Sequence, residues 1–244
     1  MRPAKILLAA GVLGLAATGA AQAQSRTFEL DGFDKVDIAT GLDARVTIGA
    51  DFSVVGSSRS QQALDSLELH VDNGVLEARI ERSFLDFILS GGLVGLLLNS
   101  GNAVSLEITL PSLTAATASS GADIDLPGLV AETIALDASS GADIEVTGAR
   151  LGAVTAEASS GSDITLEGTA DRIRIDASSG ANVDADALVS AEAEAHASSG
   201  ASIGLHATAA VRARASSGGD IEVEGNPTRR DVETSSGGDV SFED

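Results

Sequence analysis

The sequence contains no cysteine, tyrosine or tryptophan, and its aromatic rings are limited to six phenylalanines. Without cysteine there is no disulfide framework, no thiolate metal site and no lipidation site after an export signal. Few rings also argue against a cleft lined by aromatic side chains for stacking sugars. Basic residues are scarce, because 15 Lys and Arg face 36 Asp and Glu, for a net charge of -21. This excess of acid predicts that nucleic acid is not a partner.

The first 23 residues have the features of an export signal. Arg2 and Lys5 precede an apolar run over 6–20, and Ala21-Gln22-Ala23 provides small residues before a cleavage point near Gln24. Such a run is shorter than the roughly 20 apolar residues of a membrane span. We therefore predict that 1–23 is a signal peptide and that the mature chain has no transmembrane span. The expected location is the bacterial periplasm, the cell surface or the medium.

The second half of the chain repeats one short phrase seven times, at intervals of 18–20 residues. A typical copy is Ala138-Ser139-Ser140-Gly141-Ala142-Asp143-Ile144. A repeat of this length is typical of a solenoid, in which each unit buries its apolar face only by stacking on its neighbours. The glycines of the seven copies are Gly121, Gly141, Gly161, Gly180, Gly200, Gly218 and Gly237.

Apolar and polar residues alternate within each repeat, which is the period of a β-strand. We predict an all-β fold, a single-stranded parallel β-helix or β-solenoid of about seven rungs over 116–244, with a thin, dry core of small side chains. Each repeated glycine is expected at positive φ, where the chain bends. The second serine of each phrase falls on the same side of the alternation as the apolar residues. This position predicts a buried, hydrogen-bonded ladder of serines, Ser120, Ser140, Ser160, Ser179, Ser199, Ser217 and Ser236.

Residues 24–115 lack the repeat but still resemble short strands. Leu67, Leu69 and Val71 face Val75 and Ala78 across the strong hairpin signal Asn73-Gly74. A helical turn is predicted over 61–66. We expect this portion to cap one end of the solenoid, because an uncovered end exposes strand edges to other chains.

An apolar insertion over 83–98 interrupts the pattern and is nearly uncharged. Three interpretations stay open: a cap over the mouth of the solenoid, a surface for self-association into a homo-oligomer, or a loop that touches a membrane. None of them is catalytic. The candidate interaction residues are Phe84, Leu85, Phe87, Ile88, Leu93, Val94 and Leu97.

The strand-rich front, the segment PSLTAATASSGADIDL at 111–126 and the repeated SSGADI or SSGGDI phrases together resemble a bacterial family, the "putative auto-transporter adhesin, head GIN domain" family. The likeness runs from about Phe33 to the end of the sequence. It implies a β-helix-like fold and a surface or periplasmic setting, and it supplies no catalytic residues. The apolar run over 83–98 departs from the more polar stretch of that family.

The candidate metal site is the column of residues that lies after each repeated turn, one position after Ala142 and its equivalents, with Asp143 as a typical member. Stacked carboxylates repel one another, and bridging by calcium, which takes six to eight oxygen ligands, would relieve the repulsion. The alternative is that each aspartate bonds nearby backbone beside a turn. No other cofactor is expected. Asn182 and Ser202 interrupt the column, whose acidic members are Asp123, Asp143, Asp163, Asp220 and Asp239.

For function, the sequence favours a noncatalytic envelope or cell-surface protein that adheres to or binds an unknown protein, a glycan or its own copies. The alternative is an exported β-helix hydrolase or lyase acting on acidic polysaccharide. His70, His196 and His206 show no metal-ligand spacing. Glu194, His196 and Ser198 share one parity, but an alternating chain produces such groupings by chance, and no oxyanion donor is identifiable. A third option with less support is an ice- or mineral-facing protein that uses the outer row formed by the first serine of each phrase, Ser119, Ser139, Ser159, Ser178, Ser198, Ser216 and Ser235.

Overall fold

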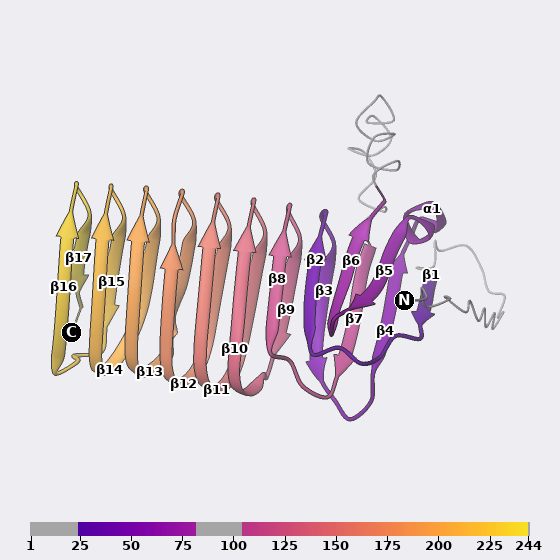
Figure 1. Cartoon of the computed structure of the whole chain (residues 1–244), viewed down its shortest axis with the longest axis horizontal. Helices are drawn as coiled ribbons and strands as arrows, with labels where there is room; N and C mark the ends of the chain where they lie inside the picture. Colours follow the sequence, from indigo (N-terminus) through magenta and orange to yellow (C-terminus); the bar gives the residue numbers. More distant parts are fainter. Residues whose placement is uncertain (1–23, 82–103, 244) are drawn as a thin grey trace.

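The computed structural model describes residues 24–81 and 104–243, so the predicted signal peptide and the apolar run 83–98 lie outside the described residues. The described residues form one sheet of 17 strands that coils into a parallel β-solenoid (Figure 1). The predicted all-β solenoid is therefore confirmed. Nowhere in residues 24–81 or 104–243 is a helix long and apolar enough to cross a membrane.

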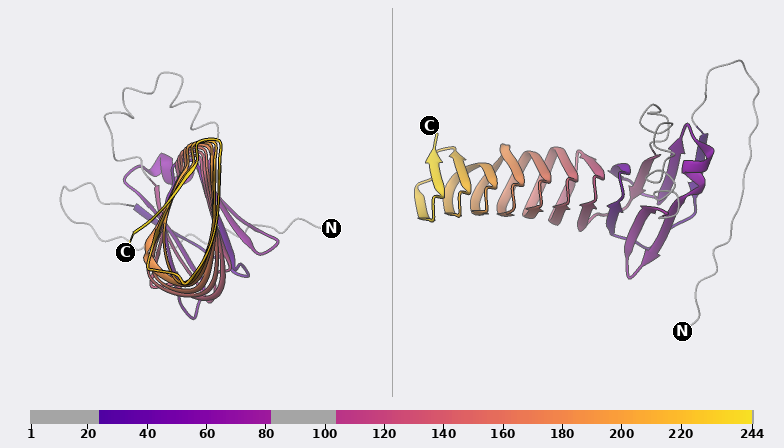
Figure 2. Two further views of the ribbon diagram at one scale, coloured as in Figure 1. Left: turned by 90° about the vertical axis from the view of Figure 1, so that its left-hand side faces the viewer. Right: turned by 90° about the horizontal axis from the view of Figure 1, so that it is seen from above.

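Each rung has two straight sides, joined at one edge by the turn that contains the repeated Ser-Gly pair (Figures 1 and 2). On the ascending face the strands run toward this turn, and on the descending face they run away from it. The ascending face contains β2 (Lys35–Ala39), β6 (Val75–Ile80), β8 (Ala115–Ser119), β10 (Val130–Ser139), β16 (Arg229–Ser235) and the second halves of β11 (Asp143–Ser159), β12 (Asp163–Ala177), β13 (Asn182–Ser198) and β14 (Ser202–Ser216). The descending face contains β3 (Asp43–Ile48), β7 (Val104–Leu110), β9 (Asp123–Pro127), β15 (Asp220–Glu224), β17 (Asp239–Phe242) and the first halves of β11 to β14.

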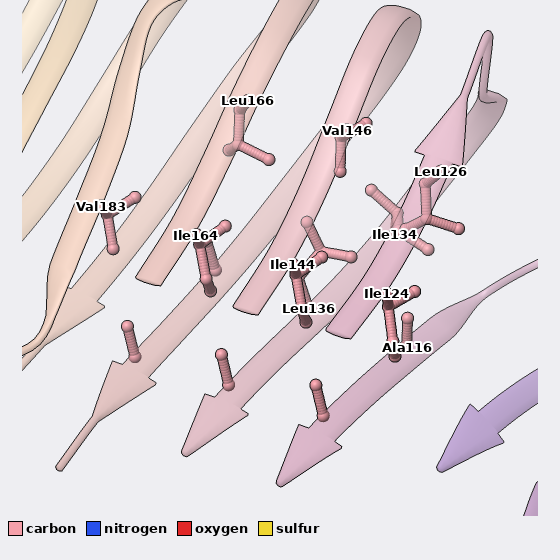
Figure 3. Packing of buried hydrophobic residues seen from close by; sticks show 14 of the residues in the cluster. Ala116, Ile124, Leu126, Ile134, Leu136, Ile144, Val146, Ile164, Leu166 and Val183 are labelled. Atoms are coloured by element: carbon pink, nitrogen blue, oxygen red, sulfur yellow. The ribbon is translucent and has the colours of Figure 1, made fainter. Parts of the chain in front are cut away.

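Parallel pairing keeps equivalent residues in register from rung to rung. Ile124 pairs with Ile144, and Ile144 pairs with Ile164, so that like side chains stack inside the coil (Figure 3). Leu126, Val146 and Leu166 form a second buried row. Burial of one such side chain contributes about 1.5–3 kcal/mol. The alternation in the sequence thus becomes a dry core between the two faces.

The repeated turns expose both of their central residues. In one copy the N–H of Ala181 donates to the carbonyl oxygen of Ser178 at 3.2 Å, and the two residues between them, Ser179 and Gly180, have φ of 57° and 71°. This is the conformation of a two-residue hairpin turn with φ > 0 at both positions. The predicted positive φ of the glycines is confirmed.

The predicted buried ladder of second serines is wrong, because every one of them is exposed at the tip of its turn. Ala138 and Ala142 are both buried and four residues apart, so an uninterrupted strand between them would also bury Ser140. The tight turn interrupts the strand between them. Two other serines of the described repeats are buried, Ser162 and Ser190. The Ser162 hydroxyl donates to the carbonyl oxygen of Ala138 at 2.8 Å and accepts from the N–H of Ser159 at 3.1 Å, and the Ser190 hydroxyl donates to the carbonyl oxygen of His206 at 2.8 Å.

The N-terminal strands continue the sheet at one end of the solenoid (Figures 1 and 2). The predicted hairpin across Asn73-Gly74 is confirmed as an antiparallel pair, and the predicted helical turn is a short helix capped by the Ser60 hydroxyl. Further antiparallel pairs, β1 with β4 and β4 with β7, extend the descending side. The elements are β1 (Gln24–Phe28), β4 (Ser53–Ser58), α1 (Gln61–Asp65) and β5 (Leu67–Asp72).

Candidate functional site

The descending face is strongly acidic. From β9 to β17 its strand segments contain no lysine or arginine. Outward positions alternate with the buried ones, so the acids of these segments stand on the surface in rows parallel to the axis of the coil. The acids of this face are Asp123, Asp125, Asp143, Glu145, Asp163, Glu167, Asp184, Asp186, Asp220, Glu222, Glu224 and Asp239.

The predicted aspartate column lies on this face, immediately after the turns. The structure stacks Asp123 on Asp143 and Asp143 on Asp163, and it stacks Asp220 on Asp239 further along, all of them exposed. Burial raises the pKa of Asp123, and the neighbouring carboxylates of Asp143 and Asp43 raise it further. No group of three His, Cys, Asp or Glu in the described ranges could hold a metal ion. Calcium bridging of the column stays a prediction.

Asp43 extends this column by one rung and was missed in the sequence. It pairs with Asp123 across β3 and β9, after a turn in which Thr40 and Gly41 have φ of 65° and 67°. The serine pair is absent from this turn, so the repeated phrase does not identify it. The recognisable signal was the spacing from Gly41 to Asp43, which is the same as from Gly121 to Asp123.

A notch on the descending face surrounds Asp186. Its volume is about 280 Å³. Gly204 provides the space, because a Cβ there would lie 2.5 Å from the Asp186 Oδ1 atom. That oxygen is buried and has no hydrogen-bond partner in the part of the chain that the structure describes. Burial, followed by the charges of Asp184, Glu224 and Glu222, raises the pKa of Asp186 to about 6.

The ascending face carries charges of both signs, which alternate along the axis over the last four rungs. One column runs Arg174, Glu194, Arg212, Asp231 from β12 to β16. Ion pairs join neighbouring rungs, such as the Arg212 Nε and Asp231 Oδ2 atoms at 2.8 Å. The others within these rungs are Arg174 with Asp176 and Glu194, Arg214 with Glu194 and Glu233, and Arg229 with Glu192.

A shallow groove of about 510 Å³ follows these rungs, above the small side chains of Ala153, Thr155 and Ala210. Five arginines and three acids contribute to its lining, although the guanidinium of Arg230 stacks on the Phe242 ring, 4.2 Å from its centroid. We call it the arginine groove; the sequence analysis did not identify it. Its charged residues are Arg172, Arg174, Arg212, Arg229, Arg230, Glu192, Glu194 and Asp231.

The grouping of Glu194, His196 and Ser198 lies along the outside of β13. His196 and Ser198 line a small hollow together with Asp137, Glu157 and Asp176. Among the described residues, His196 makes no side-chain hydrogen bond to Ser198 or to Glu194, whose carboxylate pairs with Arg174 and Arg214. The geometry expected of a nucleophile with its base is therefore not formed there.

The apolar candidates from Phe84 to Leu97 lie outside the described residues. The chain leaves the ascending face after Ile80, at the end of β6, and enters the descending face at Val104, at the start of β7. In the neighbouring rung the short turn at Thr40-Gly41 joins the equivalent strands β2 and β3. The role of the insertion stays a prediction.

A family model described as "Putative auto-transporter adhesin, head GIN domain" matches residues 32–227. The chain belongs to this family. The resemblance noted in the sequence is thereby confirmed. No curated protein matches the sequence.

Solved structures from Bacteroides and Parabacteroides species share the fold. A "putative adhesin" from Bacteroides fragilis has a TM-score of 0.78 at 16% identity, covering 92% of this chain and 98% of its own. A "putative lipid binding protein" from Parabacteroides distasonis has a TM-score of 0.68 at 13% identity, covering 91% and 97%. A "putative adhesin" from Parabacteroides merdae has a TM-score of 0.62 at 13% identity, covering 91% and 96%. At these identities the likeness concerns the fold.

Proposed function

We propose that this family member is a noncatalytic, exported protein that binds its ligand on the outer faces of the solenoid, in the periplasm or at the bacterial cell surface. The observation that carries the proposal is the regular array of charged side chains on both faces. A rigid ladder of backbone hydrogen bonds holds these side chains at a fixed spacing, which suits repeated contacts with an extended partner.

The interior supports an outer rather than an inner binding site. Along the coil the inward side chains are packed against one another from rung to rung, as the rows at Ile144 and Val146 illustrate (Figure 3). The Parabacteroides distasonis relative is described as lipid binding. In the present chain a lipid would have to bind outside the packed core.

The family supports adhesion or binding as the class of function, and the export signal predicted over 1–23 fits a protein of the cell surface or periplasm. The outer surface of β13 argues against catalysis, because the described residues include no hydrogen bond between His196 and Ser198, and Glu194 pairs with Arg174 and Arg214. Two histidines do contact carboxylates, His70 with Glu77 at 3.3 Å and His206 with Glu224 at 3.6 Å. The repeated charges at a fixed spacing on the same faces are the feature that favours binding over turnover.

The test is a panel of immobilised polysaccharides and proteins exposed to the chain from Gln24 onward. We expect retention on at least one member without new reducing or unsaturated ends. New ends would establish the alternative, a polysaccharide hydrolase or lyase. Absence of retention on every member would refute binding of the classes in the panel.

A further inference from the structure

The basic residues of the repeats are sorted onto one face. Between 116 and 244 there are seven, all arginines, and all lie in segments of the ascending face. The descending segments of these repeats contain aspartate and glutamate but no lysine or arginine. The two sheets of a coil are about 10 Å apart, and outward side chains add to this distance. Charges separated in this way are largely screened from each other at physiological ionic strength.

The arginine groove collects five of these seven residues. Its floor is made by small side chains, Ala153, Thr155 and Ala210, so the neighbouring guanidinium groups stand above it as walls. Four of the five arginines, Arg172, Arg174, Arg212 and Arg229, face outward beside the three acids of the lining. The fifth, Arg230, takes the inward register position of Val211 and stacks on Phe242. In a chain with a net charge of -21, this groove is therefore a local attractor for anions.

The arginines are spaced along the groove by the rungs themselves. Arg172 on β12 and Arg212 on β14 are two rungs apart along the coil and are offset by two residues along the strands, because Arg172 is in register with Glu192 and Ala210. With about 4.8 Å between strands, arginines on alternate rungs are about 10 Å apart. This distance is on the scale of one disaccharide, so a linear chain with an acidic group in each disaccharide could present one anion to each arginine row.

The guanidinium groups retain donors for such anions. Arg172 makes no ion pair within 4.0 Å in the described part of the chain, although Glu192 is its partner in the strand register. The Arg212 Nε atom contacts Asp231. Each guanidinium has five N–H donors in a planar fork and recognises carboxylate or sulfate groups through paired hydrogen bonds.

Other anionic surfaces fit less well. A bilayer would need apolar anchors, but the large hydrophobic residues exposed in the described ranges, Ile48, Val130, Val189 and Val232, do not line the groove. Single-stranded nucleic acid stacks its bases on aromatic rings, and the lining contains none.

From these observations we propose that the arginine groove binds a linear anionic polysaccharide whose carboxylate or sulfate groups pair with Arg172 and Arg212. The polymer lies along the axis of the solenoid, above Ala210. This inference rests on the proposed binding function and names the chemical class of the ligand. Asp137, Glu157 and Asp176 stack on one another nearer the Ser-Gly turns and line a separate hollow, so this acidic row lies outside the groove.

The test measures binding of alginate, a linear polyuronate, to the chain from Gln24 onward by biolayer interferometry. The double substitution Arg172→Gln and Arg212→Gln should weaken binding about tenfold or more. A matched control, Arg26→Gln with Arg59→Gln, removes the same charge from the N-terminal portion and should leave binding unchanged. Ala210→Glu, which adds an acid to the floor, should weaken binding while preserving the circular dichroism spectrum.

Neutral dextran and single-stranded DNA serve as comparison ligands. Equal alginate binding by the wild type and both groove variants would overturn the groove assignment, while the proposed binding function would stand. Absence of alginate binding by the wild type would also overturn the assignment. Tighter binding of DNA than of alginate would contradict the polysaccharide class. The proposed function is judged separately, by retention on the wider panel.

Discussion

The raised pKa of Asp186 predicts a pH-dependent gain in stability when its charge is removed. The Oδ1 atom of this residue is buried above Gly204 among acidic neighbours, and its pKa rises from 3.8 to about 6. The folded chain thus holds the proton more tightly than the unfolded chain. This carboxyl favours folding below about pH 4, and its contribution is lost as the pH rises through about 6.

The magnitude follows from the size of the change. A rise of about two pH units in pKa corresponds to about 3 kcal/mol. Because Asp186 is only half-buried, solvent screening reduces this to about 1 kcal/mol. Asp186→Asn should therefore stabilise the protein by about 1 kcal/mol at pH 7.5, which raises the Tm by about 2–4 °C.

The assay is urea unfolding of wild type and Asp186→Asn at pH 7.5 and pH 5. At pH 5 the folded wild type keeps most of its proton, so the gain should fall to about half. Asp51→Asn, which removes one exposed charge from the loop after β3, controls for net charge and should give no comparable gain. A gain of equal size at both pH values, or none at pH 7.5, would refute the assignment of the strain to this carboxylate.

Three further predictions concern the backbone, the end of the coil and the cation. Gly168→Ala should lower the free energy of unfolding in urea by several kcal/mol, because its φ is 135° and a Cβ there would collide with the Ala149 carbonyl oxygen. The control Gly161→Ala, at φ 68° with open space around the Cβ, should lower it by about 1–2 kcal/mol. Equal losses of stability in the two variants would contradict the collision. On the last rung the Arg230 guanidinium stacks 4.2 Å from the Phe242 ring centroid. Arg230→Val should expose an apolar strand edge, so light scattering should detect oligomers whose proportion rises with protein concentration. A variant that is monomeric at all concentrations would show that this arginine does not protect the edge. Calcium bridging of the aspartate column predicts a higher Tm in millimolar calcium than in magnesium and sodium at matched ionic strength, and an unchanged Tm would exclude it.

Much of the fold could be predicted from the sequence because strand alternation and turn glycines are local signals. The seven glycines after the serine pairs and the hairpin at Asn73-Gly74 appear in the structure as expected. The inner position of Ser140 was predicted wrongly. The prediction assumed that inward and outward side chains alternate through the two-residue turn, but the side chains at the tip of the turn point to solvent.

The candidate site was harder to predict because it depends on how rungs align. Arg172 and Arg212 are 40 residues apart, and their placement along one groove requires the register of three strands. The separation of charge between the two faces likewise depends on which half of each long strand forms each face. The aspartate column was accessible because each member follows a recognisable turn, and Asp43 was missed because its turn lacks the serine pair.

Size-exclusion chromatography with light scattering on a mixture of alginate and the chain from Gln24 onward tests binding without catalysis most directly. The account predicts that the polymer elutes together with the protein and that its chain-length distribution is unchanged after prolonged incubation. Shortened polymer would contradict the noncatalytic role, and separate elution of polymer and protein would contradict the binding site on the ascending face.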